Sequence, residues 1–403
     1  MLESGSKGAT DKVGSLTLRA IVVIEVTLSF CLLILCGLNV SFTLQMTDIE
    51  YGADSQDIDT AMVNLTSNRY QAHQPRLQYM TDLADELRRH PAIGDVTIST
   101  AFPGQRATAF AYNLSATETR VHESLPQTSV IWIDANYFDV LNIDFEGRQF
   151  DVTDTENTPT VAIVDSEFAA DNWPNESALG KRLQLDPERD NQWLTVVGVG
   201  QLVVQRFPIK AWRNPTVYRY VRQDMPRQFT VGIKSVIEIS PQKIFKAASG
   251  NVDRDIPVNN IKPLVDIQQV NLVEFKFFAY LLTVIASVAL FLAVVGIYGI
   301  ISRSIFLRAN EIGIRRAIGS TKKSIINIYL RQGIGYLFFG AIIGGGAALA
   351  LFNIIPSRLT GTIEIPFVYG STLLIFGILI MLASYLPVRK IVAMEPGEAL
   401  HYE

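Results

Sequence analysis

The charged residues whose spacing points most clearly to a functional site lie in RSIFLRANEIGIRRAIGSTKKSIINIYLRQ, residues 303–332. Isoleucines recur among many cations in this segment, which predicts an amphipathic helix that lies along a membrane surface and turns at Gly319 into the apolar stretch that follows. Two interpretations are open. The segment is either a positively charged loop without a partner, or a short helix that offers Glu311, Arg315 and Arg316 to a cytoplasmic protein.

A second ionisable residue stands out because of its surroundings. Glu25 is the only charged residue between Arg19 and Asp48, inside a long apolar stretch. A charged group within a membrane span is costly and tends to face protein or water. Because Glu25 lies about two helical turns after Arg19, we favour an interfacial position or a bond to a neighbouring group over a role in a substrate path.

The remaining motifs argue against catalysis and against a bound cofactor. The pair Gly180-Lys181 is followed by Arg182 and lacks the earlier glycine of an ATP-binding loop. The histidines are scattered and form no H-E-x-x-H motif or Cys/His cluster, so we expect no metal site. They are His73, His90, His122 and His401. No acidic pair has a reason to act as acid and base, and a net charge of −4 argues against nucleic acid as a partner.

Long apolar stretches surround these candidate residues. The chain is 48% hydrophobic and 18% charged, which is too apolar for an ordinary soluble protein. A hydrocarbon core of about 30 Å needs roughly 20 apolar residues in a helix. Four stretches satisfy this: Arg19 to Asp48, Lys276 to Arg303, Arg331 to Arg358 and Glu364 to Arg389. We predict a membrane protein with four transmembrane α-helices, one before and three after a large α+β domain, the first being a retained anchor.

The basic residues that flank these stretches predict their orientation. Cytoplasmic loops of membrane proteins carry an excess of Lys and Arg. The flanking cations are Lys7, Lys12, Arg19, Arg303, Arg308, Arg315, Arg316, Lys322, Lys323, Arg389 and Lys390. We therefore expect both termini and the segment between the second and third spans to be cytoplasmic, and the large domain to lie on the opposite side.

The sequence between the first two spans is that of a soluble α+β domain with two subdomains. Apolar residues recur at helical spacing from Leu77 to Leu87 and stop before His90-Pro91. Strand-like stretches follow at 96–100, 161–166, 193–200, 216–221 and 231–240. From Ile261 the sequence again favours a helix, which would run into the second span as a stalk.

Glycines are concentrated in the third span, at Gly333, Gly335, Gly340 and 344–346. Small residues let helices approach closely in lipid. Two interpretations are open: a tight and mobile seam with a partner helix, or ordinary packing within this chain.

Several motifs together resemble the MacB/FtsX-type ABC transporter permeases. EIGIRRAIGS at 311–320 and PVRKIVAMEPGEAL at 387–400 look like the C-terminal signature of that family. HPAIGDVTISTAFPG at 90–104 and NYFDVLNIDFEGRQF at 136–150 resemble its periplasmic core domain, as do shorter stretches up to TVVGVG at 195–200. The resemblance covers nearly the whole chain.

This resemblance implies a permease subunit without ATPase motifs of its own, working with a cytoplasmic ABC ATPase dimer that would hold ATP and Mg²⁺. A second permease subunit, identical or different, would complete the transporter. The coupling residues, matched one by one to the family motif, are Glu311, Gly313, Arg315, Arg316 and Gly319. The expected location is the bacterial cell inner membrane, with the large domain in the periplasm.

The expected order of parts follows from the spans and from the resemblance. It is a cytoplasmic N-terminus (1–18), first span and stalk (19–46), periplasmic core domain (47–270, with a distinct subdomain at about 126–205), stalk and second span (271–302), coupling helix (303–328), third span (329–356), periplasmic loop (357–365), fourth span (366–388) and cytoplasmic C-terminus (389–403).

The sequence does not identify the substrate or protein on which such a permease would act. The leading hypothesis is mechanotransmission for export of a peptide, toxin, antibiotic or other compound, with a periplasmic adaptor and an outer-membrane channel. An FtsX-like regulator of a periplasmic hydrolase, a lipoprotein-extracting permease and a membrane scaffold without an ATPase are the alternatives.

Overall fold

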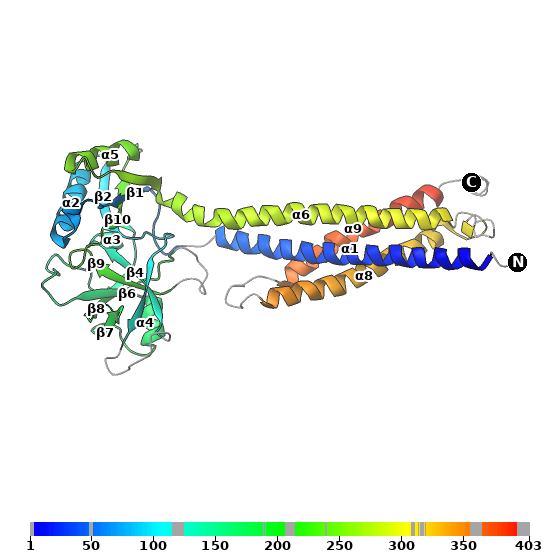
Figure 1. Cartoon of the computed structure of the whole chain (residues 1–403), viewed down its shortest axis with the longest axis horizontal. Helices are drawn as coiled ribbons and strands as arrows, with labels where there is room; N and C mark the ends of the chain where they lie inside the picture. Colours follow the sequence, from blue (N-terminus) through cyan, green and yellow to red (C-terminus); the bar gives the residue numbers. More distant parts are fainter. Residues whose placement is uncertain are drawn as a thin grey trace. The chain divides into compact units, whose positions relative to one another are not determined.

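The chain forms two compact units in the computed structural model (Figure 1). The helical unit comprises Met1–Gln45 and Glu274–Glu403, and the outer unit comprises Met46–Val273. The structure describes residues 4–47, 51–114, 125–187, 189, 191–205, 214–237, 240–307, 311, 312, 314, 318, 320–354 and 365–392.

Four long helices carry the predicted membrane spans. They are α1 (Ser4–Thr47), α6 (Leu264–Leu307), α8 (Lys322–Ile354) and α9 (Ile365–Val392). Within them, Ala20–Gln45, Val273–Leu307, Lys322–Leu351 and Ile365–Arg389 are long and apolar enough to cross a membrane. The expected fold class, one span before a large α+β domain and three after it, is confirmed.

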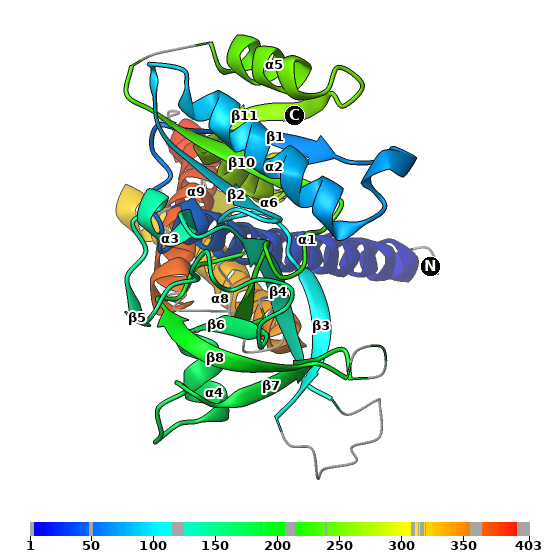
Figure 2. The ribbon, with the colours of Figure 1, turned by 90° about the vertical axis from the view of Figure 1, so that its left-hand side faces the viewer.

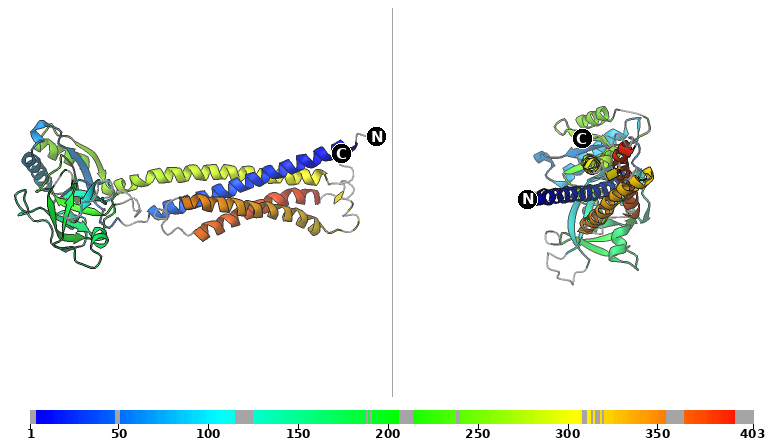
Figure 3. Two further views of the ribbon diagram at one scale, coloured as in Figure 1. Left: turned by 60° about the horizontal axis from the view of Figure 1, so that its bottom comes forward. Right: turned by 90° about the vertical axis from the view of Figure 1, so that its right-hand side faces the viewer.

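The helical unit is packed around α1, and its four helices lie side by side (Figure 3). Val26 and Ile34 of α1 are fully buried and belong to one apolar cluster with residues of the other helices. Phe30 lies 5.5 Å, between ring centroids, from Phe376 of α9. Large apolar side chains such as Phe291 of α6 remain exposed, as expected where lipid is the solvent.

In its described residues, the outer unit is built on a sheet of eleven strands. They are β1 (Ile58–Asn64), β2 (Ile93–Ser99), β3 (Thr108–Asn113), β4 (Gln127–Ile133), β5 (Phe145–Gly147), β6 (Val161–Asp165), β7 (Arg182–Leu185), β8 (Trp193–Gly200), β9 (Thr216–Tyr220), β10 (Gln228–Ser235) and β11 (Val258–Pro263). The order is β11-β1-β10-β2-β4-β3-β7-β8-β6-β9, with β5 on β8 and a further parallel pairing of β4 with β9.

The β4–β9 pairing closes one part of this sheet into a ring. β4, β3, β7, β8, β6 and β9 each pair with two neighbours in the ring, and their inward side chains form a separate core that includes Leu183, Val196 and Val217. The subdomain expected at about 126–205 covers only part of this ring. The ring begins with β3 at Thr108 and ends with β9 at Tyr220, because β4 pairs with both of these strands.

The other part of the sheet is covered by helices. These are the 3-10 turn η1 (Asn68–Tyr70), α2 (His73–Arg88) and α5 (Pro241–Val252), while α3 (Tyr137–Val140) and α4 (Ser166–Asn172) are short. Figure 2 shows α2 and α5 beside each other over β1, β10 and β2. The Tyr79 hydroxyl of α2 lies 3.1 Å from Ser249 Oγ of α5. The helix predicted from Leu77 to Leu87 is present, with both end residues facing the core or its margin.

The helix before the second span begins later than its pattern predicts. Ile261 lies in β11, and α6 starts at Leu264. Residues Val258–Pro263 pair antiparallel with β1, so tertiary hydrogen bonding overrides the local helical pattern there. The helix thus follows directly after an edge strand of the outer unit.

Candidate functional site

The predicted coupling segment lies between α6 and α8. Of its five motif residues the structure describes Glu311, which is exposed and helical. Gly313, Arg315, Arg316 and Gly319 lie outside the described residues.

One isoleucine holds this segment to the helical unit. Ile312 is 7% exposed and belongs to the same buried cluster as Ile305 of α6 and Ile325 and Tyr329 of α8. The segment is therefore anchored where one long helix ends and the next begins. Movement of the segment would displace both α6 and α8, because packed side chains transmit displacement.

Two other isoleucines of the segment face away from the protein. Ile314 and Ile318 are 53% and 82% exposed, and the Ile318 backbone N–H donates to the Ile314 carbonyl at 3.0 Å. This helical turn places both side chains on one face. An exposed apolar pair at this four-residue spacing suits a pocket on a partner protein. The recurrence of isoleucines predicted an apolar face in this segment, but the residues matched to the family motif were charges and glycines and did not include Ile314 or Ile318.

The beginning of α8 adds positive charge beside this turn. Thr321 caps the helix, its Oγ1 accepting from the Ser324 backbone N–H at 3.4 Å. Lys322 and Lys323 are exposed in the first turn, where the helix dipole disfavours cations. Their presence is better explained by contact with an acidic partner or with lipid headgroups than by helix stability.

Glu25 lies in the seam between α1 and α6. A Cβ at position 296 would come 2.6 Å from Glu25 Oε2, so the carboxyl group rests directly on the Gly296 backbone. One turn further along α1, the Ser29 hydroxyl donates to the Ala289 carbonyl at 2.9 Å. The structure thus places Glu25 against a neighbouring helix, while its proposed functional role stays a prediction.

A side chain at position 296 should compete with Glu25 for this space. We expect Gly296→Val to destabilise the helical unit by about 1–3 kcal/mol through overpacking. Gly299→Val is the matched control on α6, because nothing lies within 4 Å of a Cβ there. The measurement is the thermal unfolding midpoint in detergent. The cost should shrink when Gly296→Val is combined with Glu25→Ala, and an unchanged cost in that double variant would disprove the contact.

The glycines of the third span separate into two groups. A Cβ at Gly340 would meet Val26 of α1 at 2.5 Å, and one at Gly344 would meet the Thr27 carbonyl oxygen at 2.5 Å. Gly335 and Gly346 have nothing within 4 Å. Close packing within the chain therefore accounts for the G-x-x-x-G pair at 340 and 344, which is how small residues bring helices together in lipid.

One buried and one half-buried carboxyl group of the outer unit have structural roles. Burial raises the pKa of Asp165 to about 7, and its oxygens accept from the Phe168 and Thr216 backbone N–H groups at 2.6 Å each. Burial also raises the pKa of Asp134 to about 6, and Thr97 Oγ1 donates to it at 2.6 Å. Asp165 caps α4 and ties it to β9, and Asp134 fixes the end of β4. Neither carboxyl lines either of two clefts of the outer unit, one lined by Thr60 and Lys262 and the other by Thr155 and Asp224.

Together these features define a multi-pass membrane protein with a large α/β domain between its first and second spans. The model of the MacB-like periplasmic core domain matches residues 30–266, and the model of the FtsX-like permease C-terminal domain matches residues 283–396. The chain belongs to the MacB/FtsX-type family of ABC transporter permeases.

Two relatives, each from a different organism, are similar in sequence to part of this chain. The ABC transporter permease YvrN of Bacillus subtilis is 26% identical over 300 residues, covering 70% of this chain and 71% of that protein. The macrolide export ATP-binding/permease protein MacB 2 of Aeromonas hydrophila is 25% identical over 308 residues, covering 71% of this chain and 45% of that protein. The crystal structure of the periplasmic region of MacB from Actinobacillus actinomycetemcomitans aligns with a TM-score of 0.35 and 15% identity, covering 56% of this chain and 97% of that one. The chain thus spans less than half the length of the MacB relative and matches its permease part.

Proposed function

We propose that this chain is the membrane subunit of a mechanotransmission ABC transporter whose ATPase is a separate cytoplasmic protein. The observation that carries the proposal is the exposed Ile314–Ile318 turn, anchored through Ile312 between α6 and α8. The family relationship supports it, since relatives are permeases or fused ATP-binding/permease proteins.

α6 offers a route from the coupling segment to the outer unit. It is a single helix of 44 residues that starts directly after β11 and ends at Leu307, and a helix of this length is about 66 Å long. Binding of ATP by the partner ATPase dimer would displace the Ile314–Ile318 turn. α6 would carry the displacement along its axis to the sheet edge formed by β11.

The proposed surroundings follow the charge distribution and the family. The chain would lie in the bacterial inner membrane beside a second permease subunit, with the coupling segment in the cytoplasm and the outer unit in the periplasm. Its work would be export of a peptide, toxin, antibiotic or other compound, through a periplasmic adaptor and an outer-membrane channel. The ATP and Mg²⁺ would belong to the ATPase.

Copurification from the native host tests this proposal. The full chain, carrying an affinity tag, would be isolated in mild detergent, and its partners would be identified by mass spectrometry and assayed for ATP hydrolysis. We expect an ABC ATPase in stoichiometric amount, with vanadate-sensitive activity. A purified chain that retains lipid and is folded but brings down no nucleotide-binding subunit would contradict it.

A further inference from the structure

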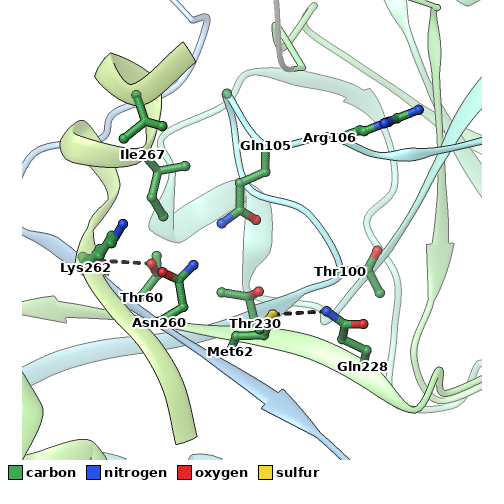
Figure 4. Close-up of a pocket in the computed structure, with 12 residues that line it drawn as sticks. Thr60, Met62, Thr100, Gln105, Arg106, Gln228, Thr230, Asn260, Lys262 and Ile267 are labelled. Carbon is green, nitrogen blue, oxygen red and sulfur yellow. Dashed lines mark hydrogen bonds between the residues drawn. The ribbon is translucent and has the colours of Figure 1, made fainter. Parts of the chain in front are cut away.

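A polar cleft of about 340 Å³ opens in the outer unit, between the edge strands of its sheet, the loop after β2 and the first turns of α6 (Figure 4). Thr60 of β1 and Thr230 of β10 form its buried floor. Met62, Ile267 and Val270 contribute apolar surface. Its volume is at the lower end of the range for ligand sites, about 300–1,000 Å³.

The charged residues around this cleft have one sign. Lys262 and Arg106 line it on opposite sides, with the Arg106 side chain directed outward from the other lining residues (Figure 4), and no Asp or Glu is among its lining residues. Within the described ranges neither cation forms an ion pair. Two unpaired cations around one concavity concentrate positive potential there, which favours an anionic ligand.

The uncharged polar groups are arranged as hydrogen-bond donors. Gln105 Oε1 accepts from the Phe102 backbone N–H at 2.9 Å, which turns the Gln105 amide nitrogen toward the cleft (Figure 4). Gln228 Nε2 donates to the Met62 sulfur at 3.0 Å, a weak acceptor that a ligand oxygen would replace. The Thr230 hydroxyl makes no hydrogen bond within the described part of the chain, although the residue is only 6% exposed. These groups match a ligand rich in carbonyl and carboxylate oxygens.

A β-bulge shapes the same cleft. Thr60 pairs with Lys262 and Met62 with Asn259, so Asn260 and Ile261 together oppose the single residue Ala61. Asn260 has a φ of +51°, a left-handed conformation that Asn tolerates better than most residues. Bulges often redirect side chains beside binding sites, and Asn260 lines this cleft. β11 is also the edge of the sheet, where the backbone of an extended peptide can approach.

We propose that this cleft binds the C-terminal end of a peptide. The terminal carboxylate would lie beside Lys262, and the preceding carbonyls would accept from Gln105, Thr230 and, at the other end of the cleft, the Gln228 amide. The small volume suits the end of a chain better than its middle, and the apolar wall suits its last side chain. This site would exist whether or not the chain works with an ATPase.

Peptide binding to the full chain in lipid nanodiscs, without ATPase or nucleotide, tests the proposal. The probe is a fluorescein-labelled apolar tetrapeptide with a free carboxylate, compared by fluorescence anisotropy with the same peptide amidated at its C-terminus. We expect the amidated peptide to bind about tenfold more weakly, because it loses the charge-assisted hydrogen bonds. Lys262→Gln and Gln228→Ala should weaken binding of the free acid by a similar factor, while Lys246→Gln on α5 should not.

Three outcomes would overturn the proposal. They are equal affinity for the free and amidated peptides, displacement of the peptide by inorganic phosphate at submillimolar concentration, and absence of binding to the wild-type chain at millimolar peptide. Lys262 and Gln228 are exposed, so unchanged unfolding midpoints should show that the variants are folded. Because no ATPase is present, failure here is distinguishable from failure of the proposed transport function.

Discussion

Replacing Gly344 by leucine is expected to prevent α1 and α8 from packing, whereas the same change at Gly346 should leave the helical unit folded. A Cβ at position 344 would lie 2.5 Å from the Thr27 carbonyl oxygen and 3.3 Å from the Cys31 backbone nitrogen. Both atoms belong to the α1 backbone, so no flexible side chain can move aside. The helices would have to separate, and α1 is the helix around which the unit is packed.

The expected cost is about 3 kcal/mol or more, at the upper end of what overpacking causes. Gly346 is two residues away on α8, is exposed, and has nothing within 4 Å of its Cβ position. Leucine there would face lipid, where it is favourable. The two variants thus differ in packing and not in helix propensity.

Fluorescence-detected size exclusion after heating in detergent measures this difference. We expect Gly344→Leu to be aggregated or to unfold at a much lower temperature than wild type, with Gly346→Leu close to wild type. Equal behaviour of the two variants would show that α1 and α8 do not approach each other through Gly344.

The membrane part of this fold could be predicted from sequence because lipid imposes a simple rule. A span needs about 20 residues without charges, and the stretches from Arg19, Lys276, Arg331 and Glu364 satisfy it. Contact with water imposes a comparable rule on the outer unit, where a strand with one face in the core alternates apolar and polar residues. Alternation from Trp193 to Gly200 predicted a strand, and β8 has these same bounds.

Pairing between distant segments was not visible in the sequence. The stretch at 216–221 was predicted as a strand and contains β9, whereas β4 was not predicted, and neither segment reveals that Val130 pairs with Val217 and thereby closes a ring. The same limit explains Ile261, which has a helical pattern around it and nevertheless lies in a strand, because β1 supplies a partner.

For the candidate sites, the sequence identified residues of interest but not the contacts that these residues make. Glu25 was identified from the cost of a charge in lipid, but the recess at Gly296 that receives it required a second helix to be placed. The sequence of the coupling segment shows an apolar periodicity, but it does not show which isoleucines face the protein and which face outward. Burial then distinguishes Ile312, which is an anchor, from Ile314 and Ile318, which are outward.

The second large effect is expected from Ile318→Asp in the coupling segment. If the Ile314–Ile318 turn docks on an ATPase, burial of Ile318 should contribute about 1.5–3 kcal/mol, and an unpaired carboxylate in that interface would cost more. We therefore expect a loss of at least about tenfold in affinity for the ATPase. The permease itself should remain folded, because the Ile318 side chain is 82% exposed.

Ile318→Leu is the matched control, since it keeps an apolar side chain of the same size at the same place. ATP hydrolysis and copurified ATPase would be measured for wild type and both variants reconstituted in nanodiscs. Ile318→Leu should retain most of the wild-type ATPase association, and Ile318→Asp should lose it while keeping the wild-type unfolding midpoint. Full association of Ile318→Asp would show that the ATPase does not contact this turn. The exposed isoleucines would then be in contact with lipid, and coupling would have to pass through another part of the cytoplasmic surface.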